Sequence, residues 1–253
     1  MSAKITRKRL DVLLVERGFA ESRQKAQAMI LAGEVEVAGA KAGKAGLQVD
    51  ETVHLTVRSR QQKYVSRGGF KLEGALQDSK VNPQGRICLD VGSSTGGFTD
   101  CLLQNGAARV YAVDVNTDQL AWKLRDDPRV IRIKKNAREL VAADSPEPVD
   151  LVAIDVSFIS VRKVLPAAIA CAKENSDLLI LVKPQFELER EHVGKGGIVR
   201  DKQLQERAIA KVTNAAESLG LASHGTFPSR LTGAEGNQEY FLHARKVPKV
   251  ESP

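Results

Sequence analysis

From residue 86 onward, short β-rich runs recur along the chain, and helix-like stretches separate them. The helix-like stretches include 98–105, 117–125 and 161–173, and the β-rich runs are RICLDV, ARVYAVDV, RVIRIKKN, VDLVAIDV and DLLILVKP. This alternation constrains the fold more than any other feature, because it predicts a mostly parallel sheet with helices on both faces. We therefore expect an α/β domain over this part of the chain.

Polar residues stand at the carboxyl ends of these runs. They are Asp90, Asp114, Asn136, Asp155 and Lys183. Ligands of parallel α/β sheets bind at this edge. The sequence therefore predicts a ligand site formed by residues that are far apart along the chain.

The glycine-rich turn after Asp90 narrows the choice of ligand. Its sequence, GSSTGG, lacks the second glycine of the dinucleotide fingerprint, and no Gly-Lys-Ser/Thr follows it as in a phosphate-binding loop. A carboxylate before the turn would repel a phosphate, but it suits the sulfonium and ammonium groups of S-adenosylmethionine. We predict a methyl-donor site that contains Asp90, Gly92, Ser93, Ser94, Thr95, Gly96 and Gly97.

Three further residues complete the predicted cofactor site. Asp114 lies 24 residues after Asp90, where a carboxylate can hold both ribose hydroxyls. Dinucleotide enzymes share this feature, so a nicotinamide dinucleotide is the alternative ligand. Asn136 is placed either to contact the adenine edge or to lie in a solvated loop, and Asp155 borders the same site.

The chemistry of the methyl acceptor follows from what the sequence lacks. Methylation of a cytosine carbon usually needs a Pro-Cys nucleophile, and no cysteine here follows a proline. Methylation of a base amino group commonly uses an Asn/Asp-Pro-Pro-aromatic turn, whereas this chain has Asp155-Val-Ser-Phe158. A ribose 2′-hydroxyl is left as an acceptor, and it needs a base or a cationic neighbour to become nucleophilic. Lys71, Asp155, Lys183 and Glu239 are the candidates, and Lys183 acts either as a base or as an electrostatic stabiliser.

The first quarter of the chain carries most of the excess positive charge. Residues 1–67 hold 13 Lys and Arg against 7 Asp and Glu, while the remainder holds 25 against 24. This asymmetry predicts a module that binds a polyanion. Two amphipathic helices are expected here, one capped by Thr6 and ended by Gly18, the other capped by Ser22. Short strands follow at EVEVAG and VHLTV.

The stretch RLDVLLVERGFAESRQKAQAMILAGEVEVAG resembles the small RNA-binding domain first described in ribosomal protein S-four (S4). The match covers roughly residues 7–60, so we expect an α+β RNA-binding domain over 1–60. A basic linker is predicted over 61–68, a catalytic domain over 69–248 and a tail over 249–253. Within the linker, Tyr64 either stacks on a base or anchors the chain. The residues expected to contact RNA are Arg7, Arg9, Arg23, Lys25 and Arg67.

The remaining motifs resemble the TlyA (hemolysin A) family of ribosomal RNA methyltransferases, which is related to the FtsJ-type enzymes. They are YVSRGGFKL, LDVGSSTGGFTD, DVSFIS, LVKPQFE and LTGAEGNQEYF. The resemblance implies a Rossmann-like, mostly parallel seven-stranded sheet, S-adenosylmethionine as cofactor and cytidine ribose of ribosomal RNA as substrate. It also implies a Lys-Asp-Lys-Glu tetrad at Lys71, Asp155, Lys183 and Glu239. We expect a monomer.

Two other functions remain as alternatives. A ribosome-assembly factor with a vestigial methyltransferase domain would bind RNA without chemistry, although the tetrad residue types are all present. A membrane-lytic protein, which the family's historical name suggests, needs a segment that enters the bilayer, and the sequence offers none. Three cysteines and four histidines show no metal-ligand spacing, so we predict no metal. The absence of a secretory signal predicts a cytoplasmic location.

Overall fold

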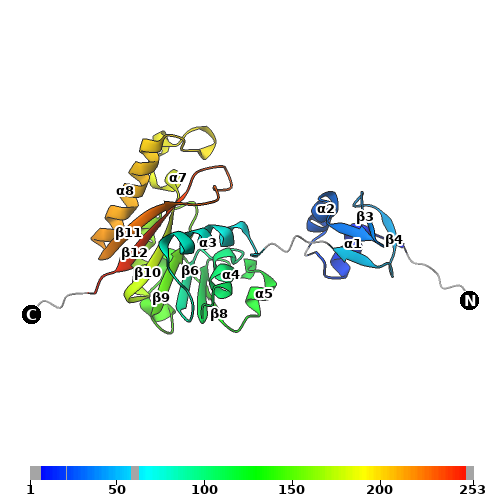
Figure 1. Ribbon diagram of the computed structural model, residues 1–253, viewed down its shortest axis with the longest axis horizontal. Helices are drawn as coiled ribbons and strands as arrows, with labels where there is room; N and C mark the ends of the chain where they lie inside the picture. Colours follow the sequence, from blue (N-terminus) through cyan, green and yellow to red (C-terminus); the bar gives the residue numbers. More distant parts are fainter. Residues whose placement is uncertain (1–6, 21, 58–62, 249–253) are drawn as a thin grey trace, which may run out of the picture. The chain divides into compact units, whose positions relative to one another are not determined.

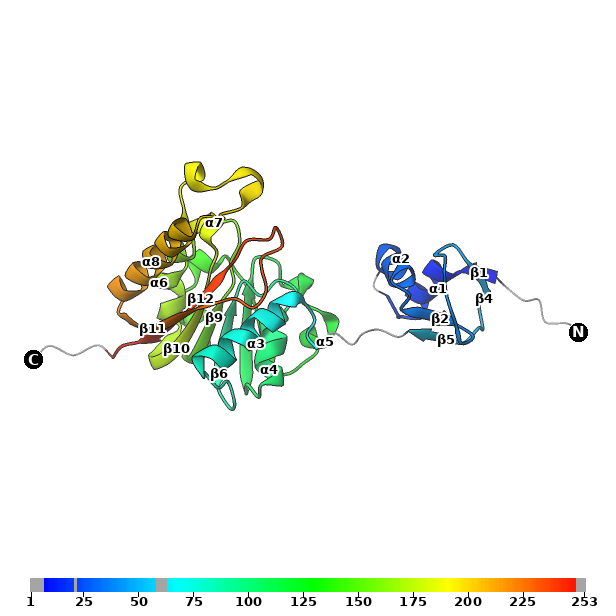
Figure 2. The same ribbon diagram turned by 45° about the horizontal axis from the view of Figure 1, so that its top comes forward.

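A computed structural model describes residues 7–20, 22–57 and 63–248. The chain divides into two compact units, residues 1–63 and 64–253, each with its own hydrophobic core (Figures 1 and 2). Among the described residues, no helix is long and apolar enough to cross a membrane.

The first unit packs two helices against two small antiparallel sheets. One sheet pairs β1 with β4, and the other has the order β3-β2-β5. Leu10, Leu14 and Ile30 from the helices lie in its core with Val35. The elements are β1 (Arg7–Arg9), α1 (Leu10–Glu16), α2 (Arg23–Leu31), β2 (Val35–Val37), β3 (Ala40–Lys41), β4 (Gln48–Asp50) and β5 (Leu55–Val57).

The start of α2 confirms a prediction, whereas the start of α1 differs from one. The Ser22 hydroxyl accepts a hydrogen bond from the Lys25 backbone N–H at 3.2 Å, so it caps α2. Helix α1 begins only at Leu10, because residues 7–9 pair with residues 48–50 as a strand. The sequence around residues 7–9 does not indicate this strand, because its partner lies about 40 residues further along the chain. Thr6, the expected cap, lies outside the described residues.

The second unit is built on one seven-stranded sheet with the order β11-β12-β10-β9-β6-β7-β8. Strands β6 to β10 run parallel, and β12 runs antiparallel to both of its neighbours. The predicted α/β fold with a mostly parallel sheet is therefore confirmed. The strands are β6 (Ile87–Val91), β7 (Arg109–Asp114), β8 (Val130–Lys134), β9 (Val149–Ile154), β10 (Ala172–Val182), β11 (Leu221–Pro228) and β12 (Tyr240–Lys246).

Helices cover both faces of this sheet (Figure 2). Apolar residues of α3 and α4, such as Leu72 and Leu102, pack on one face in one core cluster. Leu165 of α6 and Val212 of α8 belong to the cluster on the opposite face. The helices are α3 (Arg67–Ser79), α4 (Gly97–Gln104), α5 (Trp122–Arg125), α6 (Leu165–Ala170), α7 (Pro184–Glu187) and α8 (Lys202–Ser218).

Two predicted helices are shorter than expected, while the third, at 98–105, corresponds to α4. The stretch 117–125 splits into a 3₁₀ turn at Thr117–Gln119 and the short α5, because Leu120 and Ala121 adopt non-helical backbone angles. The stretch 161–173 contains another 3₁₀ turn, then α6, and β10 already begins at Ala172. Both helices were overestimated because alanine and leucine favour helix wherever tertiary contacts do not decide.

Candidate active site

Asp90, near the end of β6, is fully buried. Its Oδ2 atom accepts hydrogen bonds from the Thr99 backbone N–H at 2.8 Å and from the Thr99 hydroxyl at 2.6 Å. Its other oxygen, Oδ1, has no hydrogen-bond partner among the described residues. Burial raises the pKa of Asp90 to about 7, although the Thr99 hydrogen bonds oppose this shift. The site thus holds a buried carboxylate with one oxygen that lacks a hydrogen-bond partner within the described part of the chain.

The glycine-rich turn after β6 passes very close to the end of β9. Gly92 has a φ of +89°, and a Cβ at this position would lie 2.2 Å from the backbone oxygen of Asp155. Only glycine fits there without displacing the backbone. The next residue, Ser93, is buried, and its hydroxyl has no partner within the described part of the chain. The turn therefore presents a second polar atom that a ligand can satisfy.

Asp114 ends β7 and fastens the turn to this strand. Its Oδ2 accepts a hydrogen bond from the Ser94 backbone N–H at 2.9 Å, and Oδ1 accepts one from the Asn116 N–H at 3.0 Å. A carboxylate has about four lone-pair positions, so both oxygens still have room for hydroxyl donors. Asn136 follows β8, and its side-chain oxygen accepts a hydrogen bond from the Arg138 backbone N–H at 3.1 Å.

The four expected tetrad residues form two ion pairs. Lys71 Nζ of α3 lies 2.6 Å from Glu239 Oε2, just before β12. Lys183 Nζ, after β10, lies 2.6 Å from Asp155 Oδ1, after β9, and donates a second hydrogen bond to the Ser157 hydroxyl at 2.7 Å. The lysine side chains are only 12% and 9% exposed, so water screens these charges less than at the surface.

A cavity of about 200 Å³ brings the turn and the ion pairs together. Lys71 and Asp155, one member of each pair, line it beside Thr95. Arg67, which was expected in the linker, is instead the first residue of α3, and it donates a hydrogen bond to the Thr232 carbonyl at 3.3 Å. Tyr64 is fully buried, which agrees with an anchor and disagrees with a base-stacking role. The complete lining is Ser66, Arg67, Gly68, Lys71, Gly92, Ser93, Ser94, Thr95, Gly97, Phe98, Asp155, Thr232 and Ala234.

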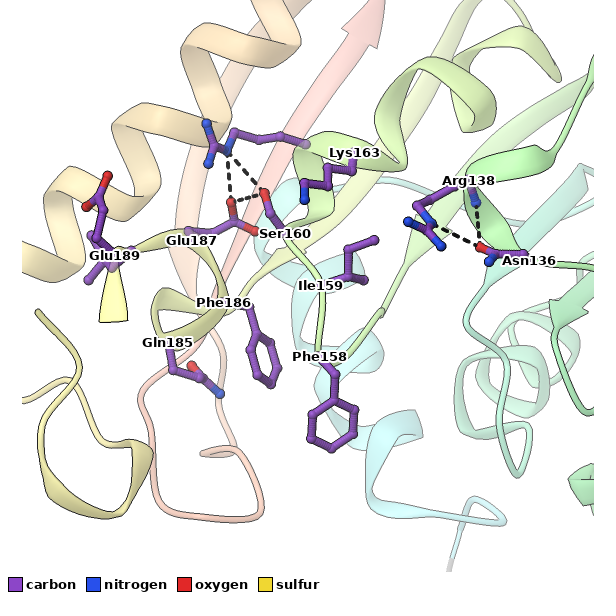
Figure 3. A pocket seen from close by; sticks show the side chains of 12 residues that line it. Asn136, Arg138, Phe158, Ile159, Ser160, Lys163, Gln185, Phe186, Glu187 and Glu189 are labelled. Carbon is purple, nitrogen blue, oxygen red and sulfur yellow. Dashed lines mark hydrogen bonds and ion pairs between the residues drawn. The ribbon is translucent and has the colours of Figure 1, made fainter. Parts of the chain in front are cut away.

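A larger cavity, of about 730 Å³, opens where β8, β9 and β10 end (Figure 3). Phe158 stands at its rim with 90% of its surface exposed and a φ of +65°, and its ring centroid lies 5.6 Å from that of Phe186. The buried carboxylate of Glu187 holds the segment after β9 in place, because it accepts hydrogen bonds from the Ser160 hydroxyl and the Val161 N–H. Asn136 lines this cavity, and so do three cationic side chains, Arg138, Arg162 and Lys163.

The expected RNA-contacting residues of the first unit are all exposed. Arg7 and Arg9 belong to β1, while Arg23 and Lys25 lie in the first turn of α2. Among the described residues, no cluster of three or more His, Cys, Asp or Glu side chains is arranged to hold a metal ion.

Several polar partners at the site were not among the predicted residues. Thr99 carries both hydrogen bonds to Asp90, and Ser157 carries one from Lys183. Ser157 and Phe158 belong to the DVSFIS motif, which pointed to this segment without assigning either a role. Thr99 gave no signal, because a threonine in the first turn of a helix is common for structural reasons.

Comparisons with known proteins agree with this arrangement. The FtsJ-like methyltransferase family matches residues 64–246, and the S4 domain matches residues 8–54. The chain is 48% identical over 241 residues to the 16S/23S rRNA (cytidine-2′-O)-methyltransferase TlyA of Mycobacterium tuberculosis, with 94% of this chain and 90% of that protein covered. It is 47% identical over 239 residues to YqxC of Bacillus subtilis, with 94% and 85% covered.

A solved structure from Streptococcus thermophilus, named as a putative hemolysin, is similar along almost the whole chain. It superposes with a TM-score of 0.73 at 39% sequence identity, and the match covers 99% of this chain and 91% of that one. Since the family match spans most of the chain and the sequence identity extends across both units, the chain belongs to the TlyA family, in which an S4 domain precedes an FtsJ-like methyltransferase domain.

Proposed function

We propose that the protein transfers a methyl group from S-adenosylmethionine to the ribose 2′-hydroxyl of a cytidine in ribosomal RNA. One observation carries this proposal: two lysine–carboxylate pairs, Lys71–Glu239 and Lys183–Asp155, meet at a cavity lined by the glycine-rich turn. The name of the 48% identical relative from Mycobacterium tuberculosis specifies the same reaction on 16S and 23S rRNA.

The residues around the turn fit the cofactor. The free Oδ1 of Asp90 suits the ammonium group, and the two oxygens of Asp114 suit the ribose hydroxyls. Asn136, which lines the larger cavity, is assigned to the adenine edge, so the adenine of the cofactor would border that cavity. When bound, S-adenosylmethionine supplies an electrophilic methyl group on a positively charged sulfur.

Lys183 is assigned to activation of the acceptor hydroxyl. A lysine ammonium has three N–H bonds, and Asp155 and Ser157 take two of them, which leaves one for the acceptor oxygen. In its charged form this amine stabilises the developing alkoxide, and in its neutral form it accepts the hydroxyl proton. Lys71 lines the same cavity and adds a second ammonium group there, with Glu239 as its counter-ion.

The larger cavity is assigned to the acceptor nucleotide. Its volume of about 730 Å³ lies in the usual range of small-molecule ligand pockets. The exposed ring of Phe158 offers a stacking surface for a base, while Arg138 and Lys163 suit the phosphates on either side.

The decisive experiment incubates the protein and labelled S-adenosylmethionine with separate small and large ribosomal subunits. We expect label in ribosomal RNA, and mapping by mass spectrometry should locate it on the ribose of a cytidine. Label on a base would contradict the proposed acceptor. RNA binding without label transfer would instead favour the ribosome-assembly factor.

A further inference from the structure

Asp11, in α1, is a fully buried carboxylate that lies beneath the arginines expected to contact RNA. Arg9 donates two hydrogen bonds to it, from Nε to Oδ1 and from Nη2 to Oδ2, each of 3.0 Å. Arg23 Nη2 donates to Oδ2 at 3.2 Å, and Gln27 Nε2 donates to the same oxygen at 2.8 Å. The Arg9 guanidinium is the main cause that holds the pKa of Asp11 well below its usual range. Asp11 is therefore ionised throughout the working pH range.

The two arginines that Asp11 binds remain accessible on their outer sides. Their side chains are 44% and 56% exposed, whereas that of Asp11 is 0% exposed. Both Nη2 atoms bond one oxygen, so the two guanidinium groups lie side by side although Arg9 belongs to β1 and Arg23 to α2. Among the described residues, neither arginine has another carboxylate partner within ion-pair distance. The cluster thus carries two positive charges and one buried negative charge.

Each guanidinium has five N–H bonds, of which Asp11 uses two from Arg9 and one from Arg23. The unused bonds can serve the oxygens of an anion at the exposed side. Forked N–H pairs match the geometry of phosphate oxygens. A free arginine loses much rotamer freedom when it binds, and a held arginine has already lost it.

We infer that Asp11 is a positioning residue for RNA binding: it holds Arg9 and Arg23 as a preformed clamp for a backbone phosphate of the RNA. This inference rests on the proposed RNA-binding role of the first unit. It assigns Asp11 no contact with RNA. The negative charge of Asp11 repels the phosphate. Asp11 therefore favours RNA binding only by arranging the two arginines.

The substitution Asp11→Asn separates arrangement from charge, because the two effects have opposite signs. It removes one negative charge, which by itself strengthens binding to RNA. If Asp11 positions the arginines, binding in the full-length chain should instead weaken about tenfold, since two long side chains must then be ordered by the RNA. The measurement is the dissociation constant for ribosomal RNA at several salt concentrations.

Glu34→Gln is the matched control. It makes the same change in charge in the same unit, and within the described part of the chain Glu34 has no side-chain hydrogen bond or ion pair. We expect binding equal to or slightly tighter than wild type. Binding by this control and by wild type tests the RNA-binding role itself, whereas the ratio of Asp11→Asn to wild type tests the positioning role.

Two readouts distinguish positioning from a structural role of Asp11. In an Arg9→Ala/Arg23→Ala background, Asp11→Asn should change the RNA affinity less than about twofold, because no clamp remains. In the wild-type protein without RNA, nitrogen-15 spectra should resolve separate Nη signals for Arg9, because the forked pair restrains its rotation. Because this second measurement uses the wild-type protein, it still tests whether Arg9 is held in place if Asp11→Asn does not fold. The inference is overturned by averaged Arg9 signals, by unchanged or tighter RNA binding of a folded Asp11→Asn variant, or by the same loss in the double-alanine background.

Discussion

Asp90 and Asp155 are both carboxylates at strand ends of one sheet, yet their surroundings suit them to different tasks. Asp155 has a lysine ammonium 2.6 Å away and serves as its counter-ion. Asp90 lies buried, with Thr99 as its only hydrogen-bond donor among the described residues, and burial raises its pKa to about 7. A carboxylate in this state gains most when a cation arrives, which is what an ammonium group of a cofactor provides.

The raised pKa predicts that cofactor binding depends on pH. Only the ionised form of Asp90 attracts a cation, so the affinity for S-adenosylmethionine should fall as the pH drops below about 7. Well below this pKa, the loss approaches about tenfold per pH unit. Titration calorimetry between pH 5.5 and 8.5 measures it. In Asp90→Asn the affinity should be weaker throughout and lack this dependence, and a wild-type affinity that is flat with pH would contradict the assignment.

Lys183 is expected to act on the rate and not on binding. Lys183→Ala should lower methylation at least about a hundredfold, because proton transfer or alkoxide stabilisation is lost, while cofactor and RNA affinities survive. Lys183→Arg should fail as well, since a guanidinium differs in shape and does not give up its proton. Lys173→Ala, near the opposite end of β10, is the control and should methylate normally. A folded Lys183→Ala variant with near wild-type turnover would remove Lys183 from the mechanism.

At the scale of elements, the turn after β6 couples the cofactor site to the acceptor site. Gly92→Ala would place a methyl group 2.2 Å from the Asp155 carbonyl oxygen, so the turn or the end of β9 must move. We expect both cofactor affinity and methylation to fall at least about tenfold, because one displacement disturbs both sites. Gly85→Ala has the same left-handed strain, with a φ of +71° and nothing within 4 Å of the new carbon. If both variants bind the cofactor equally well, the close packing of the turn against Asp155 does not determine cofactor affinity.

Within the sheet, Asp177 of β10 links β12 to the segment before β6. Its buried carboxylate accepts hydrogen bonds from His243 and Arg245 of β12 and from Arg86 before β6. Against the effect of burial, these donors hold its pKa below the usual range. Stability from this cluster is therefore present above the ordinary carboxyl pKa and is lost as the pH falls through the lowered value.

Asp177→Asn should lower the free energy of unfolding at pH 7 by about 3 kcal/mol, because three donors lose their charged partner. The difference from wild type should shrink below about pH 4, because the Asp177 carboxyl then takes up a proton in the unfolded chain while it stays ionised in the folded protein. Thermal and denaturant unfolding across this range measure both effects. Asp126→Asn, on the exposed end of α5, should change little. An equal loss at pH 3 and pH 7 would contradict the electrostatic explanation.

The sequence predicted individual positions at this scale better than it predicted their pairing. Asp90, Asp114, Asp155 and Lys183 stand where the strand pattern placed them, because apolar runs mark strand ends directly. The partnership of Lys71 with Glu239 spans 168 residues and depends on the insertion of β12 beside β10, which the local pattern does not encode. Strand β1 was missed for the same reason, since its partner is β4.

At the scale of the whole molecule, two units with separate cores divide the work that we propose. The first unit carries the basic excess, and the second holds the cofactor turn and both lysine–carboxylate pairs. Residues 64–253 alone should bind S-adenosylmethionine as tightly as the full chain. Their affinity for ribosomal RNA should be much weaker and its dependence on salt flatter, because fewer phosphate contacts form. Salt titrations of both proteins test this, and equal slopes would show that the first unit does not supply the electrostatic affinity.

The position of β12 in the sheet has a consequence for synthesis. This strand lies between β10 and β11, although both precede it in the chain, and Glu239 directly precedes it. While the chain is being made, the sides of β10 and β11 that later pair with β12 stay unpaired. Lys71 also lacks Glu239, its counter-ion among the described residues, until residue 239 has emerged. Pairing over such a sequence separation is slow to form. A growing chain can thus form its cofactor turn early. The second lysine–carboxylate pair, Lys71–Glu239, forms only when β12 is inserted.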